Sequence, residues 1–151
     1  MKVTAKADYA VRAALELAGV DDGLVKGEQI ARSQQIPLKF LENILIDLRH
    51  AGLVHAQRGA EGGYRLARSP AEVTLGDVIR AVEGPLASVR GEPPESVSYD
   101  GAAEHLQTVW IAVRASLRAV LDDLTLAEVV EGRLPQNVQR LTEPPDAWLR
   151  R

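Results

Sequence analysis

The sequence contains no cysteine. This absence excludes disulfides, thiol nucleophiles, zinc sites built on thiolates and cysteine-ligated iron–sulfur clusters. Aromatic residues make up only 4% of the chain, so the core must consist mainly of Leu, Ile, Val and Ala, which favours helices. No apolar run approaches the about 20 residues that a membrane-spanning helix needs. The first residues also lack the apolar segment of a signal peptide. We therefore expect a cytoplasmic protein that makes no contact with a membrane.

The net charge is small, but the charges are unevenly placed. The 151 residues suffice for one ordinary domain, or for a small domain with an extension, and their net charge is −3. Residues 1–68 carry ten Lys or Arg against eight Asp or Glu, whereas residues 69–151 carry eight against thirteen. The small basic excess favours contact between the first half and a polyanion. The acidic total does not exclude DNA binding, because the position of a few cations matters more than their sum.

Apolar residues at spacings of three and four predict three helices in the first third of the chain. The first runs from about Ala5 to Gly19 with Thr4 as its N-cap, the second from about Gly27 to Gln34, and the third from Pro37 to Ala51. Only about three residues separate the last two helices, a spacing typical of a helix-turn-helix. Amphipathic helix pairs are common, so this spacing alone is weak evidence for DNA binding.

A glycine-rich segment follows the third helix. Leu53–Arg58 and Tyr64–Ala67 have the composition of two short strands, and residues 59–63 between them contain three glycines suited to a tight turn. A β-hairpin placed directly after a helix-turn-helix is typical of a winged helix. Considered alone, the segment is better explained as an ordinary solvated hairpin in which glycine provides only the turn.

The second half is expected to be helical as well. Thr74 begins a helix to about Val82 with Asp77 as its capping-box partner, and Thr125 with Glu128 begins a short helix ending near Gly132. Residues 85–100 have the composition of a loop, and residues after Pro135 show little pattern, so we expect a mobile tail.

Between them, a helix of about 30 Å is expected from Gly101 to Asp122. Its apolar stripe is too long for so small a chain to bury, so pairing with a second copy is the favoured explanation. A core helix within one chain is the alternative. The stripe consists of Leu106, Val109, Trp110, Val113, Leu117, Val120 and Leu121.

Taken together, these segments resemble the Rrf2 family of bacterial transcription regulators over roughly residues 1–134. The similarity is carried by VTAKADYAVRAALELA, QIPLKFLENILIDLRHAGLV, RGAEGGYRLAR, TLGDVIRAVEG and TLAEVVEG. The resemblance implies a mainly α fold with a small β-wing: a winged helix-turn-helix in residues 1–84, a loop at the family's sensor position in 85–100, and a dimerisation helix with a short following helix in 101–134. It also implies a homodimer, repression of transcription, and double-stranded DNA with a pseudo-palindromic operator as the partner.

The resemblance implies three groups of DNA contacts. The recognition helix would enter the major groove, Arg58 of the wing would enter the minor groove, and a third group would hold phosphates. Gly59 and Gly63 would let the wing backbone approach the DNA. Core packing is an alternative role for Phe40, and solvation for Glu42, while Arg12 and Arg32 are expected to be surface cations. The recognition-helix contacts are Leu38, Lys39, Phe40, Glu42 and Asn43, and the phosphate contacts are Thr4, Lys6, Tyr9, Arg49 and Tyr64.

The chain departs from the family where iron–sulfur members carry three cysteines. The corresponding segment, residues 87–107, contains none, and Glu104 with His105 makes too weak a ligand set to replace them. We therefore expect no metal and no cofactor. A small-molecule or protein effector is expected to act at residues 85–100, and His50 and His55 are candidates for tuning DNA binding with pH.

The sequence is compatible with one other class of function and argues against another. The same fold is compatible with a protein-interaction module that binds a metabolic enzyme or a partner regulator, with DNA binding secondary. An enzyme is not expected, because no catalytic residues assemble: the chain has no cysteine, no suggestive Ser, His and carboxylate spacing, and no phosphate-binding glycine loop after a strand.

Overall fold

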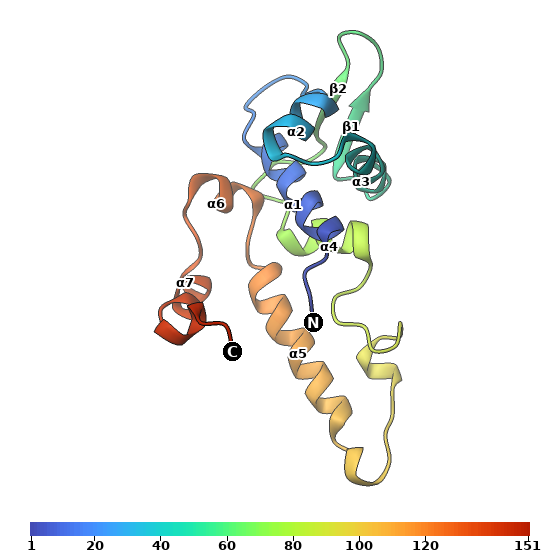
Figure 1. Cartoon of the computed structure of the whole chain (residues 1–151), viewed down its shortest axis with the longest axis vertical. Coiled ribbons are helices and arrows are strands. Elements are labelled where there is room, and N and C mark those ends of the chain that lie inside the picture. The colour runs from blue at the N-terminus through green and yellow to red at the C-terminus, as the bar shows by residue number, and fades with distance from the viewer.

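A computed structural model describes residues 1–151 as a winged-helix head from which one long helix projects (Figure 1). The head contains three helices, a two-stranded wing and a fourth helix. After the fourth helix, the long helix projects from the head, and the helices that follow it lie beside the head. The elements are α1 Ala5–Ala18, α2 Gly27–Gln34, α3 Leu38–His50, β1 Val54–Gln57, β2 Gly63–Leu66, α4 Leu75–Glu83, α5 Leu106–Leu121, α6 Leu126–Glu131 and α7 Gln136–Thr142, with short 3-10 turns at Pro94–Ser96, Gly101–Ala103 and Pro145–Trp148.

The core of the head forms where α1 crosses α3 and α4. The side of α1 that faces inward carries small residues, Ala10, Ala13 and Ala14, which are at most 1% exposed. Small side chains let the neighbouring helices approach closely, and the larger residues of α3 fill the remaining space. Leu41, Ile44, Leu45 and Leu48 are all buried, as their spacing predicted.

The wing is an antiparallel hairpin with an additional strand contact. Its register pairs His55 with Arg65 and Ala56 with Tyr64. Tyr64 also forms a bridge to Val25: each backbone N–H donates to the other residue's carbonyl over 2.8 Å. The sequence predicted only a loop at Val25. This bridge joins the base of the wing to the segment that leads into α2.

An antiparallel bridge between Thr74 and Thr125, the N-caps of α4 and α6, joins the head to the segment after α5. Thr74 with Asp77 caps α4, and Thr125 with Glu128 caps α6, both as predicted. The segments before these helices lie antiparallel, with the Leu75 N–H donating to the Leu124 carbonyl over 2.9 Å and the Leu126 N–H donating to the Val73 carbonyl over 2.9 Å.

Helix α5 projects away from the head and has no buried residue (Figure 1). It begins at Leu106, five residues later than expected, because Gly101–Ala103 forms a separate 3-10 turn. Its 16 residues correspond to about 24 Å rather than about 30 Å. No helix in the structure is long and apolar enough to span a membrane.

The tail after Pro135, for which the sequence predicted no helix, contains a short one. Residues 136–142 form α7, and Pro145–Trp148 forms a 3-10 turn against it. Asn137 Nδ2 donates to the Ala119 carbonyl of α5 over 2.9 Å, and Val138 is buried. A helix of seven residues with one buried apolar side chain leaves too little periodicity to be recognised in a sequence.

Candidate nucleic-acid interface

The exposed face of α3 lies opposite its buried stripe. Lys39, Glu42 and Asn43 are all exposed in its first turns, and Leu38 is 37% exposed beside them. Ile46 continues the same face at 43% exposure. Ile46 was not predicted as a site residue. Its position outside the apolar spacing of the buried stripe could have indicated an exposed apolar side chain. The helix therefore presents two charged, one amide and two aliphatic side chains to the surroundings, which suits readout of base edges in a major groove.

Phe40 occupies an intermediate position between the two roles considered for it. Its side chain is 42% exposed, and its ring packs edge-on against Tyr9 of α1, with centroids 5.6 Å apart and planes at 88°. Such edge-to-face packing is a favoured geometry for two aromatic rings. Phe40 therefore joins the first turn of α3 to α1, while one part of the ring stays exposed.

The wing tip leaves one cation free. Arg58 is exposed and makes no hydrogen bond or ion pair within the chain. The tip itself is held by Lys26, whose Nζ donates to the Ala60 carbonyl over 2.7 Å. Gly62 closes the turn by donating its N–H to the Gly59 carbonyl over 3.0 Å. The guanidinium of Arg58 is thus presented to solvent on a constrained loop.

A groove of about 590 Å³ separates the wing from the N-terminal end of α2. Its walls include three cations, Lys26, Arg49 and Arg58, against one acidic residue, Glu28 in the first turn of α2. The N-terminus of a helix carries a partial positive charge and unpaired N–H groups, so the groove favours anions. Lys26 was not predicted from the sequence, because no local pattern placed it beside the wing.

Two of the expected phosphate contacts are engaged inside the chain. Lys6 forms an ion pair with Asp47 of α3, with 2.9 Å between Nζ and Oδ2. The Thr4 hydroxyl accepts from the Ala7 N–H over 3.0 Å and donates to the carboxylate of Glu83. Both residues remain near the surface, but their polar groups already have partners.

Arg12, expected to be a surface cation, is partly exposed and has partners within the chain. Its Nη2 lies 2.9 Å from Oδ2 of Asp8, and its Nη1 donates to the Gln34 carbonyl over 2.6 Å. The guanidinium carbon also lies 4.8 Å from the centre of the Tyr9 ring. Arg32, by contrast, forms no ion pair or hydrogen bond through its side chain.

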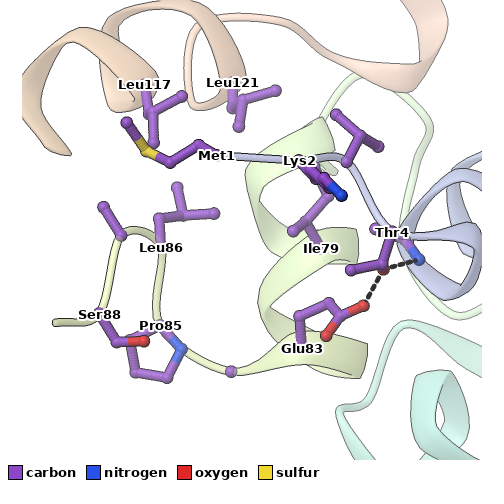
Figure 2. A pocket seen from close by; sticks show the side chains of 14 residues that line it. Met1, Lys2, Thr4, Ile79, Glu83, Pro85, Leu86, Ser88, Leu117 and Leu121 are labelled. Atoms are coloured by element: carbon purple, nitrogen blue, oxygen red, sulfur yellow. Dashed lines mark hydrogen bonds between the residues drawn. The ribbon is translucent and has the colours of Figure 1, made fainter. Parts of the chain in front are cut away.

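The apolar stripe of α5 divides between two directions. Leu117 and Leu121 face the head, where they line a groove of about 490 Å³ with Met1, Ile79 and Leu86 (Figure 2). Val109, on another part of the helix, is 50% exposed. The remaining stripe residues, Leu106, Trp110, Val113 and Val120, are half-buried.

The loop before α5 is tied to that helix by polar contacts. Gln107 Nε2 donates to the Val97 carbonyl over 2.7 Å, and Trp110 Nε1 donates to the Tyr99 hydroxyl over 3.1 Å. Arg114 forms an ion pair with Glu95. The pKa of Glu95 lies below its ordinary value, first because of a hydrogen bond to its own backbone and then because of Arg114. Residues 95–99 of this loop are thus attached to α5.

Comparisons with known proteins decide the family. A profile of the Rrf2 family, described as "Iron-dependent Transcriptional regulator", matches residues 3–132. An HTH-type transcriptional regulator of Mycobacterium tuberculosis, Rv1287, is 46% identical over 144 residues, which cover 95% of this chain and 89% of the relative. The chain belongs to the Rrf2 family. As a member of that family it is a DNA-binding transcriptional regulator and not an enzyme.

Solved structures of other Rrf2 proteins share the fold. CymR of Bacillus subtilis, described as the global cysteine regulator of that organism, superposes with a TM-score of 0.74 at 33% identity, covering 87% of this chain and 98% of CymR. IscR of T. potens gives a TM-score of 0.70 at 35% identity, covering 93% of this chain and 96% of IscR. The winged-helix architecture expected from the sequence is therefore confirmed.

The residues of this Rrf2 protein do not fit an iron site. The chain has no cysteine, and nowhere do three His, Asp or Glu side chains gather as a ligand set. Glu104 and His105 lie 3.0 Å apart, but their side chains are 62% and 91% exposed, and no further ligand joins them. One carboxylate and one imidazole at the surface supply too few donors for an iron–sulfur cluster.

Proposed function

We propose that this Rrf2 protein is a homodimeric repressor that reads a pseudo-palindromic operator. The observation that carries the proposal is the placement of two features in one head: the exposed first turns of α3 and the unpaired Arg58 on the wing that follows it. An α-helix fits the major groove, where each base pair presents a distinct pattern of donors and acceptors. An arginine on an adjoining wing suits a narrow minor groove, because its negative potential attracts the guanidinium.

The base contacts that we propose come from three polar residues of α3. Lys39 donates to guanine, Asn43 pairs with the adenine edge, and Glu42 accepts from the amino group of cytosine. Leu38 and Phe40 supply apolar contact to thymine methyl groups. The exposure of these five side chains in the first turns of α3 supports this assignment.

The phosphate contacts that we propose centre on the groove between α2 and the wing. Arg49, Tyr64 and Lys26 line it, and the N-terminal end of α2 adds its partial positive charge. Tyr9, Thr4 and Lys6 would contribute on the α1 side. We expect Lys6 to contribute less than Arg49, because Asp47 already neutralises its charge.

The dimer that we propose forms through α5. No residue of this helix is buried within one chain, and Val109 and Ile111 are 50% and 38% exposed. Removing such side chains from water stabilises association by about 25 cal/mol per Å² of apolar surface. A two-fold dimer places its two recognition helices about one turn of DNA apart, which requires a pseudo-palindromic site.

The effector that we propose, a small molecule or a protein, acts where the head meets α5. The groove of Figure 2 has walls from the N-terminal segment and α4 on one side and from α5 on the other. Residues 85–88 of the loop that follows α4 complete it. An effector bound there shifts the spacing of the two heads only if it binds their alternative arrangements unequally.

The test is selection of bound sequences from fragmented genomic DNA with the purified full-length protein. We expect enrichment of a palindromic site and an affinity that falls steeply as salt rises, because bound phosphates release counterions. Lys39→Ala should relax base preference at one position of each half-site, at a cost of about 1–3 kcal/mol per contact. Arg58→Ala should weaken all sites and reduce the preference for A·T flanks. Arg140→Ala on the distant α7 serves as the control, and parental binding by both test variants would contradict this placement.

A protein-interaction module is the second candidate, because the C-terminal segment exposes a group of apolar side chains. Leu141, Trp148 and Leu149 are 59%, 77% and 67% exposed. Exposed apolar patches mark interaction sites. Co-purification of a metabolic enzyme together with no enrichment of any palindromic DNA would favour this function over the first.

A further inference from the structure

We propose that Arg12 is a positioning residue of the DNA-reading surface, one that sets the orientation of α3 without touching DNA. This inference rests on the proposed function, because it assumes that α3 reads the operator. Arg12 lies in the middle of α1, and its contacts lead toward the beginning of α3. They connect it to the end of α2, to Asp8 of its own helix, and to the aromatic pair of Tyr9 and Phe40.

The first contact completes the C-terminal end of α2. The last carbonyls of a helix have no partner within it and carry a partial negative charge, so a guanidinium is a favourable partner. Arg12 Nη1 donates to the carbonyl of Gln34, the last residue of α2, over 2.6 Å. The next residue, Gln35, adopts a left-handed conformation at φ 53° and ψ 47° without being glycine. Such a conformation persists only where surrounding contacts impose it, and Arg12 supplies one of them.

Glu16, one helical turn further along α1, acts on the same turn. Its carboxylate accepts from the Ser33 hydroxyl over 2.7 Å and from the side-chain amide of Gln34. Arg12 and Glu16 thus hold the residues between α2 and α3 from the same face of α1. The angle between the two helices depends on this turn, which places the orientation of α3 under their control.

The second route to α3 passes through aromatic rings. The guanidinium carbon of Arg12 lies 4.8 Å from the centre of the Tyr9 ring, within the range of a cation–π interaction. Tyr9 in turn packs edge-on against Phe40 in the first turn of α3. The planar guanidinium therefore supports the ring on which the base-reading end of α3 rests.

The bonding of Arg12 favours a positioning role over a simple phosphate contact, because both terminal nitrogens of the guanidinium already have partners within the chain. Its Nη2 is paired with Asp8, its Nη1 with Gln34, and its Nε is shielded from solvent without any hydrogen-bond partner. A buried unpaired donor is unfavourable, so an arginine kept only for surface charge would not be expected to adopt this placement. The guanidinium of Arg12 thus bonds to groups within the chain, and Asp8 balances its charge.

The test compares Arg12→Met and Arg12→Lys with the full-length parent, on the duplex selected from genomic DNA and on a random duplex. For Arg12→Met we expect an about tenfold or greater reduction of affinity for the selected site, with broadened base preference under α3. Affinity for the random duplex and the slope of log affinity against log salt should stay as in the parent. The lysine keeps the charge but not the planar fork, so Arg12→Lys should also show reduced specific affinity. Arg140→Met removes an equal charge from α7 and should bind as the parent does.

Each outcome decides the matter. Parental binding by Arg12→Lys overturns the inference, because charge alone would then suffice. Removing one phosphate contact makes the salt slope shallower by about 0.9, as we expect for Arg49→Met. The same change in Arg12→Met also overturns the inference, because Arg12 would then bind a phosphate itself. If circular dichroism shows that Arg12→Met does not fold, Arg12→Lys decides alone. A parent protein that enriches no sequence refutes the proposed function instead, and so the two failures are distinguishable.

Discussion

Replacing Gly62 with alanine tests whether the shape of the wing is set by steric contact with its own backbone. A Cβ built at Gly62 lies 2.1 Å from the Gln57 carbonyl oxygen and 2.8 Å from the Arg58 carbonyl carbon. Ordinary contacts of a Cβ begin near 3.4 Å, so the turn must open by roughly 1 Å. Both neighbours are backbone atoms of the same hairpin, and neither can move away by a simple side-chain rotation.

The expected cost follows from what this opening breaks. Forcing an extra carbon into a tightly packed position typically costs about 1–3 kcal/mol. If the turn opens instead, the hydrogen bond from the Gly62 N–H to the Gly59 carbonyl breaks, and the neighbouring Gln57–Gly63 pair is displaced. Each such bond contributes about 0.5–1.5 kcal/mol, which gives a similar total. We therefore expect Gly62→Ala to lower the free energy of unfolding by about 1–3 kcal/mol.

Urea unfolding followed by circular dichroism measures the stability change, and hydrogen exchange of the wing amides shows where it occurs. The matched control is Gly19→Ala, which adds the same methyl group at φ −78°, with its nearest contact 3.5 Å away. That control should be neutral or slightly stabilising, because alanine restricts the unfolded chain. Unchanged stability and unchanged wing exchange in Gly62→Ala would refute the steric reasoning.

Two further predictions concern α5. Val109→Glu should raise the dissociation constant of the dimer at least about tenfold in sedimentation experiments, because a charge in an apolar interface is costly, while Val130→Glu at a similarly exposed valine of α6 should not. Arg114→Gln should raise the pKa of Glu95 toward its ordinary value in a carboxyl NMR titration, although its backbone hydrogen bond should keep it below that value. Because its folded-state pKa is lowered, ionised Glu95 stabilises the fold at pH values above its unfolded pKa. This stabilisation disappears as pH falls through the folded-state pKa. Arg114→Gln should therefore make stability depend less on pH in this range. An unmoved Glu95 titration would contradict the assigned cause.

Unlike iron–sulfur members of its family, this protein has no cysteine, and polar contacts with α5 hold the loop before that helix. The loop before α5 is not left without contacts: Gln107 and Trp110 of α5 hold it through Val97 and Tyr99. The loop and the helix are therefore coupled.

Interactions between residues close together in the sequence determine most of the secondary structure of this protein. The helix starts after Thr4 and Thr125 follow from their caps, and the start at Gly27 follows from apolar spacing within a few residues of chain. The wing followed in the same way from two short strands around clustered glycines. These features rest on interactions between neighbours in the sequence, so the sequence displays them directly. The late start of α5 and the helix at residues 136–142 were missed, because segments of only one or two turns carry almost no periodic signal.

Only the tertiary structure decided which side chains are free to act. Arg12 and Lys6 resemble free surface cations in the sequence, yet Arg12 bonds to Gln34, 22 residues away, and Lys6 pairs with Asp47 of another helix. Lys26 shows no local motif and nevertheless holds the wing at Ala60. Each of these partnerships joins residues far apart in the chain. Whether a charge faces solvent or a partner depends on how helices cross, and that geometry arises only when the core packs.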